Sequence, residues 1–204
     1  MSSSFWIILL AVAVYGVAHS WLASLQAKAL AQRSLGASAA RGYRLAYNIF
    51  AVVTLLPVLA LPALLPDRSL YTIPSPWVYL TLALQGLALA ALALGVLQTG
   101  AWSFLGLEQL FAPAPSEPPP LVVKGLYRWV RHPLYTAGLV FIWLVPVMSA
   151  NLLALNIGLT LYLIIGAYFE ERKLLREYGA AYADYQKRTP MLLPGANWNR
   201  RSTG

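Results

Sequence analysis

Residues 133–169 read PLYTAGLVFIWLVPVMSANLLALNIGLTLYLIIGAYF and contain no Lys, Arg, Asp or Glu over 37 positions. About 20 apolar residues cross a hydrocarbon core of roughly 30 Å, so this run is too long for one crossing and short for two. Pro146, Ser149 and Asn151 supply turn chemistry inside it. We therefore predict a tight helical hairpin whose first arm is short.

Three further uncharged runs, residues 5–25, 45–66 and 69–107, indicate that the rest of the chain is also embedded in a membrane. Apolar residues make up 59% of the sequence and charged residues 11%, which agrees with this assignment. No Lys or Arg precedes the first run, so we interpret it as a mature helix rather than a cleaved signal peptide. The predicted fold is all-α, a polytopic integral membrane helical bundle with about five transmembrane helices, near residues 5–25, 45–65, 77–99, 134–148 and 152–169.

The net charge of +8 comes from basic residues in short segments beside the apolar runs. This placement favours a cytoplasmic membrane surface over nucleic acid, so the expected partner is the lipid bilayer and no nucleic acid. The absence of cysteine excludes disulfides, thiol catalysis, Cys-zinc sites and attached c-type haem. Two histidines far apart in the sequence leave too few ligands, so we expect no metal.

The distribution of Lys and Arg predicts the orientation in the membrane. The connection after the first run carries no acidic residue, whereas residues 66–76 carry only Arg68 against Asp67. The first connection is therefore predicted to be cytoplasmic, with the N-terminus outside, the C-terminus in the cytoplasm, and a bacterial inner membrane as the location. The basic residues of that connection are Lys28, Arg33, Arg41 and Arg44.

The chain is expected to form one membrane domain, residues 1–204, in successive parts. These are a three-helix part (1–110), a proline-rich spacer (111–120), a hairpin with a C-terminal helix (121–194) and a flexible tail (195–204).

Aromatic and aliphatic residues recur at helical spacing after the last apolar run, at Leu174, Tyr178, Tyr182 and Tyr185. This pattern predicts an amphipathic cytoplasmic helix, bent at Gly179, that lies on the membrane or folds back over the bundle.

Polar residues inside the apolar runs are few, and Asn48, Gln85 and Gln98 are expected to form hydrogen bonds between helices. No internal repeat supports an inverted-repeat transporter. The sequence carries no signal for a particular oligomeric state.

Basic residues gather where the predicted hairpin begins. Pro133 suits the first helical position, because its missing N–H would be unpaired there, and this puts His132 at the cap. A helix N-terminus presents free N–H groups and partial positive charge, so with these bases it forms an anion site. For Lys124 and Arg128 the alternative is simple anchoring to lipid headgroups. The bases are Lys124, Arg128, Arg131 and His132.

Glu170 and Glu171 follow directly on the second arm, and a hairpin returns that arm beside Arg131 and His132. Acidic residues at a membrane edge are costly unless partnered, which makes them candidates for function. S-adenosylmethionine carries a carboxylate, an ammonium and a sulfonium, and this site offers partners of both signs. The alternative is an ion pair between Arg131 and one of the glutamates that closes the bundle.

Short motifs follow one another in this region: KGLY at residues 124–127, RHPLY at 131–135, EE at 170–171 with LL at 174–175, and YGAAYADY at 178–185. In order and spacing they resemble the isoprenylcysteine carboxyl methyltransferase-like (ICMT-like) family, a superfamily that includes the phospholipid methyltransferases. The resemblance covers residues 124–194. It implies a helical bundle that binds S-adenosylmethionine as co-substrate on the cytoplasmic side and receives an apolar acceptor from the membrane.

By matching positions the resemblance implies a donor-binding set, and within it Arg131 would hold the local structure or the donor carboxylate. Arg131, Glu171 and His19 are the catalytic candidates. Thr189-Pro190 and Leu193-Pro194 stand where the family often has Val-Pro and Ile-Pro, so the acceptor side departs from the pattern. The donor-binding set is Lys124, Gly125, Leu126, Tyr127, Arg131, His132, Pro133, Tyr135, Glu170 and Glu171.

The N-terminal half carries His19 with Ser20, and YRLAYN at residues 43–48. These features are similar to the NnrU-like membrane proteins, a related group associated with nitrogen-oxide metabolism. His19 lies toward the cytoplasmic end of the first predicted span, at the depth of the donor site. It is either an acceptor-side base or a packing residue that is hydrogen-bonded to a neighbouring helix.

The sequence thus predicts an S-adenosylmethionine-dependent membrane methyltransferase that acts on an apolar or lipid-like acceptor, and a thiol, a carboxylate or an amine is compatible. The alternative is an NnrU-like accessory membrane protein without catalysis of its own. A channel or transporter is not favoured, because the second and third spans lack the polar stripe that it requires.

Overall fold

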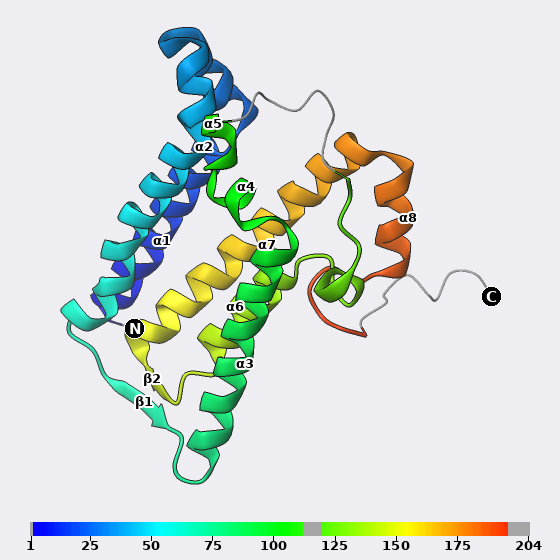
Figure 1. Ribbon diagram of the computed structural model, residues 1–204. Helices are drawn as coiled ribbons and strands as arrows, with labels where there is room; N and C mark the ends of the chain where they lie inside the picture. The colour runs from blue at the N-terminus through cyan, green and yellow to red at the C-terminus, as the bar shows by residue number, and fades with distance from the viewer. Residues whose placement is uncertain (1, 112–119, 196–204) are drawn as a thin grey trace. The chain divides into compact units, whose positions relative to one another are not determined.

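The computed structural model describes residues 2–111 and 120–195 of the chain, and these are mostly helical (Figure 1). Within the described residues, four helices are long and apolar enough to cross a membrane. They are α1 (Ser3–Leu22), the part Arg41–Leu64 of α2 (Leu25–Leu64), α3 (Trp77–Gln98) and α7 (Ala150–Tyr178). The predicted all-α membrane fold is therefore confirmed. Most of the predicted spacer (111–120) and of the predicted flexible tail (195–204) lies outside the described residues, at 112–119 and 196–204.

The predicted fourth span, residues 134–148, contains helix α6 (Pro133–Trp143), which has only 11 residues. With a rise of 1.5 Å per residue, α6 is about 16 Å long, roughly half of a hydrocarbon core. Pro146 limits the helix, because the residue before a proline is biased away from helical geometry. The first arm is thus as short as predicted, and strand β2 (Val147–Ser149) follows it.

Strand β2 pairs antiparallel with β1 (Ser69–Thr72), a feature that the sequence did not predict. Strands of three and four residues are too short to show the two-residue periodicity of a β-strand.

Hydrogen bonds that join Asn151 to residues 65–67 lie beside the strand pair. Asp67 Oδ1 accepts a hydrogen bond from the backbone N–H of Asn151 at 3.0 Å. The Asn151 amide in turn donates to the carbonyls of Leu65 and Pro66, each at 3.2 Å.

Helix α2 includes the connection that was predicted after the first span. Its first part is rich in Ala, Leu and Gln, which are strong helix formers, so this connection is helical rather than irregular. Gly36, with a φ of 80°, interrupts the helical geometry and divides α2 at a kink.

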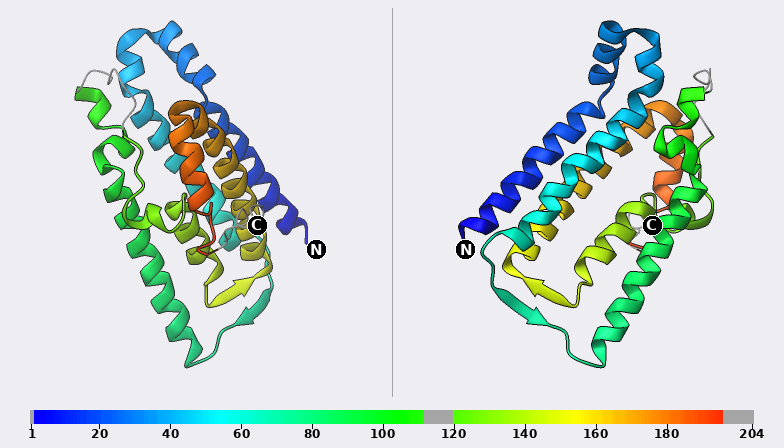
Figure 2. Two further views of the ribbon diagram at one scale, coloured as in Figure 1. Left: turned by 90° about the vertical axis from the view of Figure 1, so that its right-hand side faces the viewer. Right: turned by 60° about the vertical axis from the view of Figure 1, so that its left-hand side comes forward.

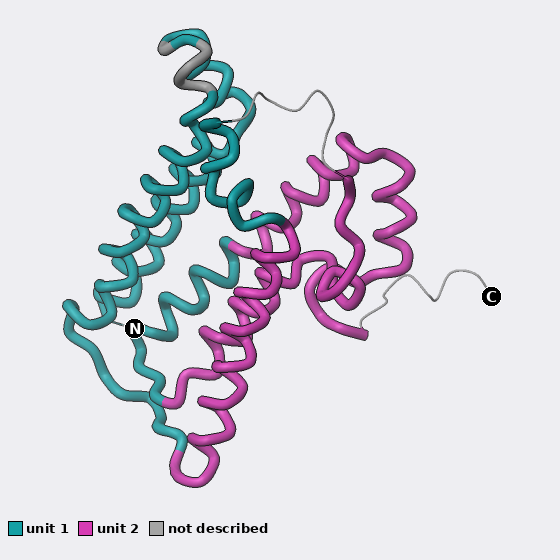
Figure 3. Tube along the Cα trace, viewed as in Figure 1, with its two compact units in different colours: residues 1–73, 100–114, 147–162 teal, residues 74–99, 115–146, 163–204 magenta. Residues whose placement is uncertain are grey.

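The chain divides into two compact units (Figure 3). Unit 1 comprises residues 1–73, 100–114 and 147–162, and unit 2 comprises residues 74–99, 115–146 and 163–204. Both units are assembled from separated stretches of sequence, and α7 contributes to each. By contrast, the sequence predicted a three-helix part and a hairpin part that are each one continuous stretch of residues.

In unit 1, α1 and α2 lie side by side (Figure 2), and α4 (Ala101–Leu105) and α5 (Glu108–Phe111) belong to the same unit. The spacing of three and four residues puts one face of α1 into the core. The Asn48 amide of α2 donates to the carbonyls of Phe104 and Leu105 at 3.0 and 2.9 Å, which confirms its predicted role. The core cluster consists of Phe5, Ile8, Val12, Val58, Ala154 and Leu155.

Unit 2 contains α3, the 3₁₀ helix η1 (Gly125–Arg128), α6, the end of α7, and α8 (Ala180–Arg188). Gln85 Nε2 in α3 donates to the carbonyl of Phe141 in α6 at 2.9 Å, a predicted interhelical hydrogen bond. Helix α8 turns back toward α7 after Gly179, whose φ is 55° (Figures 1 and 2). The predicted bend is confirmed, and the amphipathic segment folds back over unit 2.

A packing prediction follows for Gly158 in α7, where an added Cβ would lie 3.0 Å from Val12 Cγ1. Gly158→Leu should lower the free energy of unfolding by about 1–3 kcal/mol, because the larger side chain overpacks this contact. Chemical unfolding in one detergent measures the change. The control is Gly166→Leu in the same helix, since a Cβ there meets nothing within 4 Å. Equal losses in both variants would contradict the packing.

Candidate functional site

The site begins at the start of α6, where the sequence predicted a charged helix N-terminus. Pro133 occupies the first helical position and His132 the cap, as predicted, and both are buried. The backbone N–H groups of Arg131 and His132 donate to the carbonyls of Pro190 and Met191 at 2.9 and 3.1 Å. The segment after α8 therefore lies along the entry to α6.

Arg131 and Glu171 form a bidentate ion pair. Arg131 Nε donates to Glu171 Oε1 at 2.9 Å, and Nη2 donates to Oε2 at 2.7 Å. The two side chains are only 11% and 9% exposed, so water screens the pair little. Arg131 Nη1 also donates to the carbonyls of Gln186, at 3.2 Å, and Thr189. One guanidinium thereby joins the entry of α6 to both α7 and α8.

The Glu171 carboxylate is hydrogen-bonded to several other side chains. Its Oε1 accepts a hydrogen bond from the Tyr182 hydroxyl at 2.7 Å and lies 2.7 Å from His132 Nε2. Its Oε2 accepts from Gln186 Nε2 at 2.6 Å. Since a carboxylate has about four lone-pair positions and Arg131 already uses two, these contacts fill it. Glu171 therefore holds surrounding groups in place.

Glu170 lies on the other side of the His132 ring. Its Oε2 is 3.6 Å from His132 Nδ1 and accepts a hydrogen bond from the Tyr135 hydroxyl at 2.9 Å. The Tyr135 ring stacks on His132, with centroids 5.3 Å apart and 11° between the planes. In contrast to Glu171, the Glu170 side chain is 44% exposed, so it lies at the outer side of the cluster.

His132 is buried between these two carboxylates. Burial by itself lowers the pKa of His132, but the hydrogen bonds and negative charges of Glu170 and Glu171 outweigh it and raise this pKa above its usual value of 6.5. The two carboxylates thus stabilise the charged imidazolium, which in turn reduces the repulsion between them.

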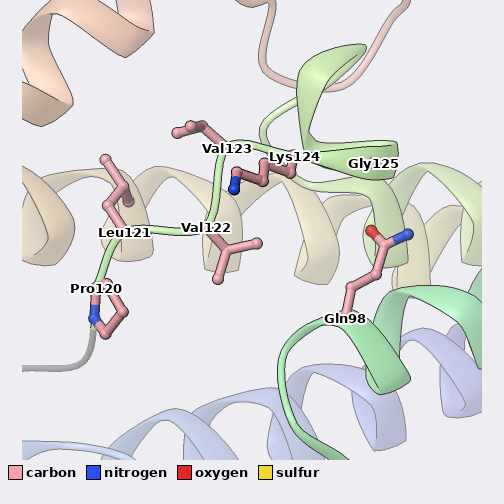
Figure 4. Close-up of a pocket in the computed structure, with 7 residues that line it drawn as sticks. All are labelled: Gln98, Pro120, Leu121, Val122, Val123, Lys124 and Gly125. Atoms are coloured by element: carbon pink, nitrogen blue, oxygen red, sulfur yellow. The ribbon is translucent and has the colours of Figure 1, made fainter.

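A pocket of about 520 Å³ lies between residues 120–125 and Gln98 at the end of α3 (Figure 4). Gly125 has a φ of 61°, and a Cβ there would overlap the Gln98 amide, so glycine permits this approach. Gln98 Oε1 of α3 accepts a hydrogen bond from the N–H of Leu126 in η1 at 3.1 Å, which agrees with the hydrogen bond between helices that was predicted for Gln98. In Figure 4 the Gln98 amide points toward Gly125, and the Lys124 side chain runs along the loop toward Val122. The pocket therefore combines apolar walls with an amide and an ammonium.

Tyr127 belongs to the same unit as these groups, and its carbonyl accepts a hydrogen bond from the Tyr185 hydroxyl. Burial raises the pKa of the Tyr127 phenol, and the charge of Glu170 raises it further. All the predicted donor-binding residues thus lie in unit 2, from Lys124 at the pocket to Glu171 in the ion pair.

Sequence reasoning missed the partners that α8 supplies, Tyr182 and Gln186. Tyr182 is 1% exposed, and its spacing on the amphipathic face predicted burial. Its hydrogen bond to Glu171 depends on the reversal of the chain at Gly179, which no local pattern specifies. The backbone contacts of residues 190–191 with the entry of α6 likewise carry no sequence signal.

His19, the catalytic candidate of the N-terminal half, lies in unit 1. Its Nε2 pairs with the Tyr47 hydroxyl of α2, and its Nδ1 lies 3.4 Å from the Tyr15 hydroxyl. The Tyr162 ring meets it edge-on, with centroids 5.8 Å apart. A neutral imidazole has one donor and one acceptor nitrogen, so one phenol donates and the other accepts. These contacts agree with hydrogen bonding to a neighbouring helix, and the role of base stays a prediction.

Fold and site together define a helical membrane protein with a charged cluster where a short helix begins. A family model described as "Protein of unknown function (DUF1295)" matches residues 6–189, so the chain belongs to the DUF1295 family. No solved structure shows a significant match to the chain.

Several similar proteins carry the names of methyltransferases. The methanethiol S-methyltransferase of Mycobacterium tuberculosis is 45% identical over 78 residues, 38% of this chain and 31% of that protein. The methanethiol S-methyltransferase of a Pseudomonas species is 33% identical over 150 residues, 72% of this chain and 56% of that protein. The protein-S-isoprenylcysteine O-methyltransferase of Mus musculus is 34% identical over 82 residues, 36% of this chain and 27% of that protein. The predicted ICMT-like resemblance is confirmed, although the chain spans only 27% to 56% of the length of these relatives.

Loss of the Arg131 guanidinium is the first test of the site. Arg131→Met should lower the free energy of unfolding by about 3–5 kcal/mol, because Glu171 then remains buried without its partner. Chemical unfolding in detergent measures this change. Arg128→Met removes an exposed guanidinium three residues earlier and should have little effect. A tolerated Arg131→Met would show that the ion pair does not hold the unit together.

The raised pKa of His132 predicts that the stability of the protein depends on pH. Because the folded-state pKa is raised, the contribution of the charged ring is fully present below about pH 6.5 and is lost as the pH rises through the folded-state pKa. Glu170 and Glu171 face the ring and Tyr135 stacks on it. The unfolding temperature of the wild type should therefore fall above about pH 6.5, relative to that of His132→Gln. Parallel pH curves for the two proteins would refute the assignment.

Proposed function

We propose that this protein is an S-adenosylmethionine-dependent membrane methyltransferase that acts on an apolar or lipid-like acceptor. The observation that carries the proposal is the side chain of Glu170, which is 44% exposed and is held by Tyr135 and His132 where the uncharged part of α7 ends. The names of the methanethiol and isoprenylcysteine methyltransferase relatives support methyl transfer.

The charges of the site fit a donor of mixed charge. Glu170 would bind a positive group of the donor, and the Tyr135 hydroxyl would fix the carboxylate in orientation. Lys124 would meet the donor carboxylate, and the pocket of about 520 Å³ beside it would take the adenosyl part. This volume lies within the usual range for small-molecule sites, roughly 300–1,000 Å³.

Arg131 and Glu171 would act as positioning residues in this proposal, since each is engaged with protein groups. Arg131 holds Glu171, Glu171 contacts His132, and His132 in turn contacts Glu170. The sulfonium of the donor supplies an activated methyl group, so the protein needs chiefly to orient the reactants and exclude water. Transfer to an anionic acceptor cancels opposite charges, and a weakly polar environment favours such a step.

The proposed acceptor enters from the bilayer, and a small apolar thiol is the first candidate, because the relative that matches 72% of this chain is named for methanethiol. His19 would serve on the acceptor side as a base. We also propose a cytoplasmic donor site in a bacterial inner membrane with the N-terminus outside, from the basic residues of the first connection.

Donor binding gives the decisive test. Wild-type protein in detergent should bind S-adenosylmethionine in calorimetry, and Glu170→Gln should weaken binding about 10- to 100-fold, because a charge-assisted hydrogen bond is lost. Glu177→Gln neutralises another exposed glutamate of α7 and is the control that should bind normally.

Labelled donor then tests the reaction with methanethiol, longer apolar thiols, apolar acids and lipid amines. Transfer of label to any acceptor supports the proposal. A wild-type protein that binds no donor and labels no acceptor would fit the NnrU-like accessory role instead.

A further inference from the structure

A second pocket, of about 460 Å³, lies on α7 and is lined by Phe169, Arg172, Leu175 and Arg176. We propose that it binds the headgroup of an anionic phospholipid, with the two arginines on the phosphate and Phe169 against the adjoining acyl chains. Lipid binding at this pocket would be independent of methyl transfer.

The two arginines are placed to share one anion. Arg172 and Arg176 are four residues apart, so they are neighbours on the helix surface, where like charges repel. Within residues 2–111 and 120–195, neither forms an ion pair with an acidic side chain. The Arg172 guanidinium lies 5.7 Å from the centre of the Tyr168 ring, and Arg176 Nε donates to the Arg172 carbonyl at 3.3 Å. A phosphate between them would relieve the repulsion and accept hydrogen bonds from both.

The apolar side of the pocket favours a lipid over a soluble phosphate. Phe169 is 59% exposed and Tyr168 57%, and Leu175 contributes a further apolar wall. The uncharged run of the sequence ends at Phe169, so the border between hydrocarbon and headgroups falls at this turn of α7. Aromatic residues favour that border, and arginines just beyond it attract anionic lipids. A soluble phosphate would leave these apolar side chains uncovered.

The test measures binding of fluorescent phosphatidylglycerol to the full chain in neutral detergent, with phosphatidylcholine for comparison. Wild-type protein should prefer phosphatidylglycerol, and the double variant Arg172→Gln/Arg176→Gln should bind it about 10-fold or more weakly. The control Lys187→Gln/Arg188→Gln removes two charges from α8, away from the pocket, and should bind as the wild type does.

Arg172→Lys/Arg176→Lys keeps the charge and should retain at least part of the preference, which separates lost binding from lost folding. Equal weakening in the α7 and α8 glutamine variants would overturn the proposal in favour of diffuse surface charge. An unchanged affinity after loss of both α7 arginines would overturn it outright. Glycerol 3-phosphate that competes as well as the phospholipid would show a soluble-anion site and refute the lipid assignment.

Discussion

The largely buried ion pair between Arg131 and Glu171 is the interaction on which the rest of unit 2 depends. Arg131 precedes the short helix α6, Glu171 lies in α7, and each also bonds to α8 or to the residue that follows it. A charge that is shielded from water is stable only when it is paired and hydrogen-bonded. Here both carboxylate oxygens of Glu171 are hydrogen-bonded. The pair therefore fixes where α8 can lie and how α6 begins.

Two consecutive glutamates take different roles because adjacent residues of a helix point about 100° apart. Glu171 faces the ion pair, while Glu170 keeps 44% of its side chain exposed beside Tyr135. His132 contacts both glutamates, and they raise its pKa, so the site favours a positive charge between two negative ones. The contact between Glu171 and His132 thereby orients the more exposed Glu170 carboxylate. Such support from surrounding groups is what a binding site needs.

Sequence reasoning succeeded where local patterns carry the information. Uncharged runs predicted the membrane helices, Pro133 predicted the start of α6, and the hairpin argument predicted that Glu170 and Glu171 return beside His132. It could not predict that Tyr182 and Gln186 donate hydrogen bonds to Glu171, since these bonds depend on the reversal of the chain before α8, at Gly179. The strand pair β1–β2 was missed because its strands are too short for a periodic signal.

A double-mutant cycle on Arg131 and Glu171 tests this account most directly. The free energy of unfolding is measured in one detergent for the wild type, Arg131→Met, Glu171→Met and the double variant. If the pair is the central contact, the double variant loses less stability than the two single losses combined, by about 1–3 kcal/mol, because neither charge is then left alone. Additive losses, equal within about 0.5 kcal/mol, would contradict the account.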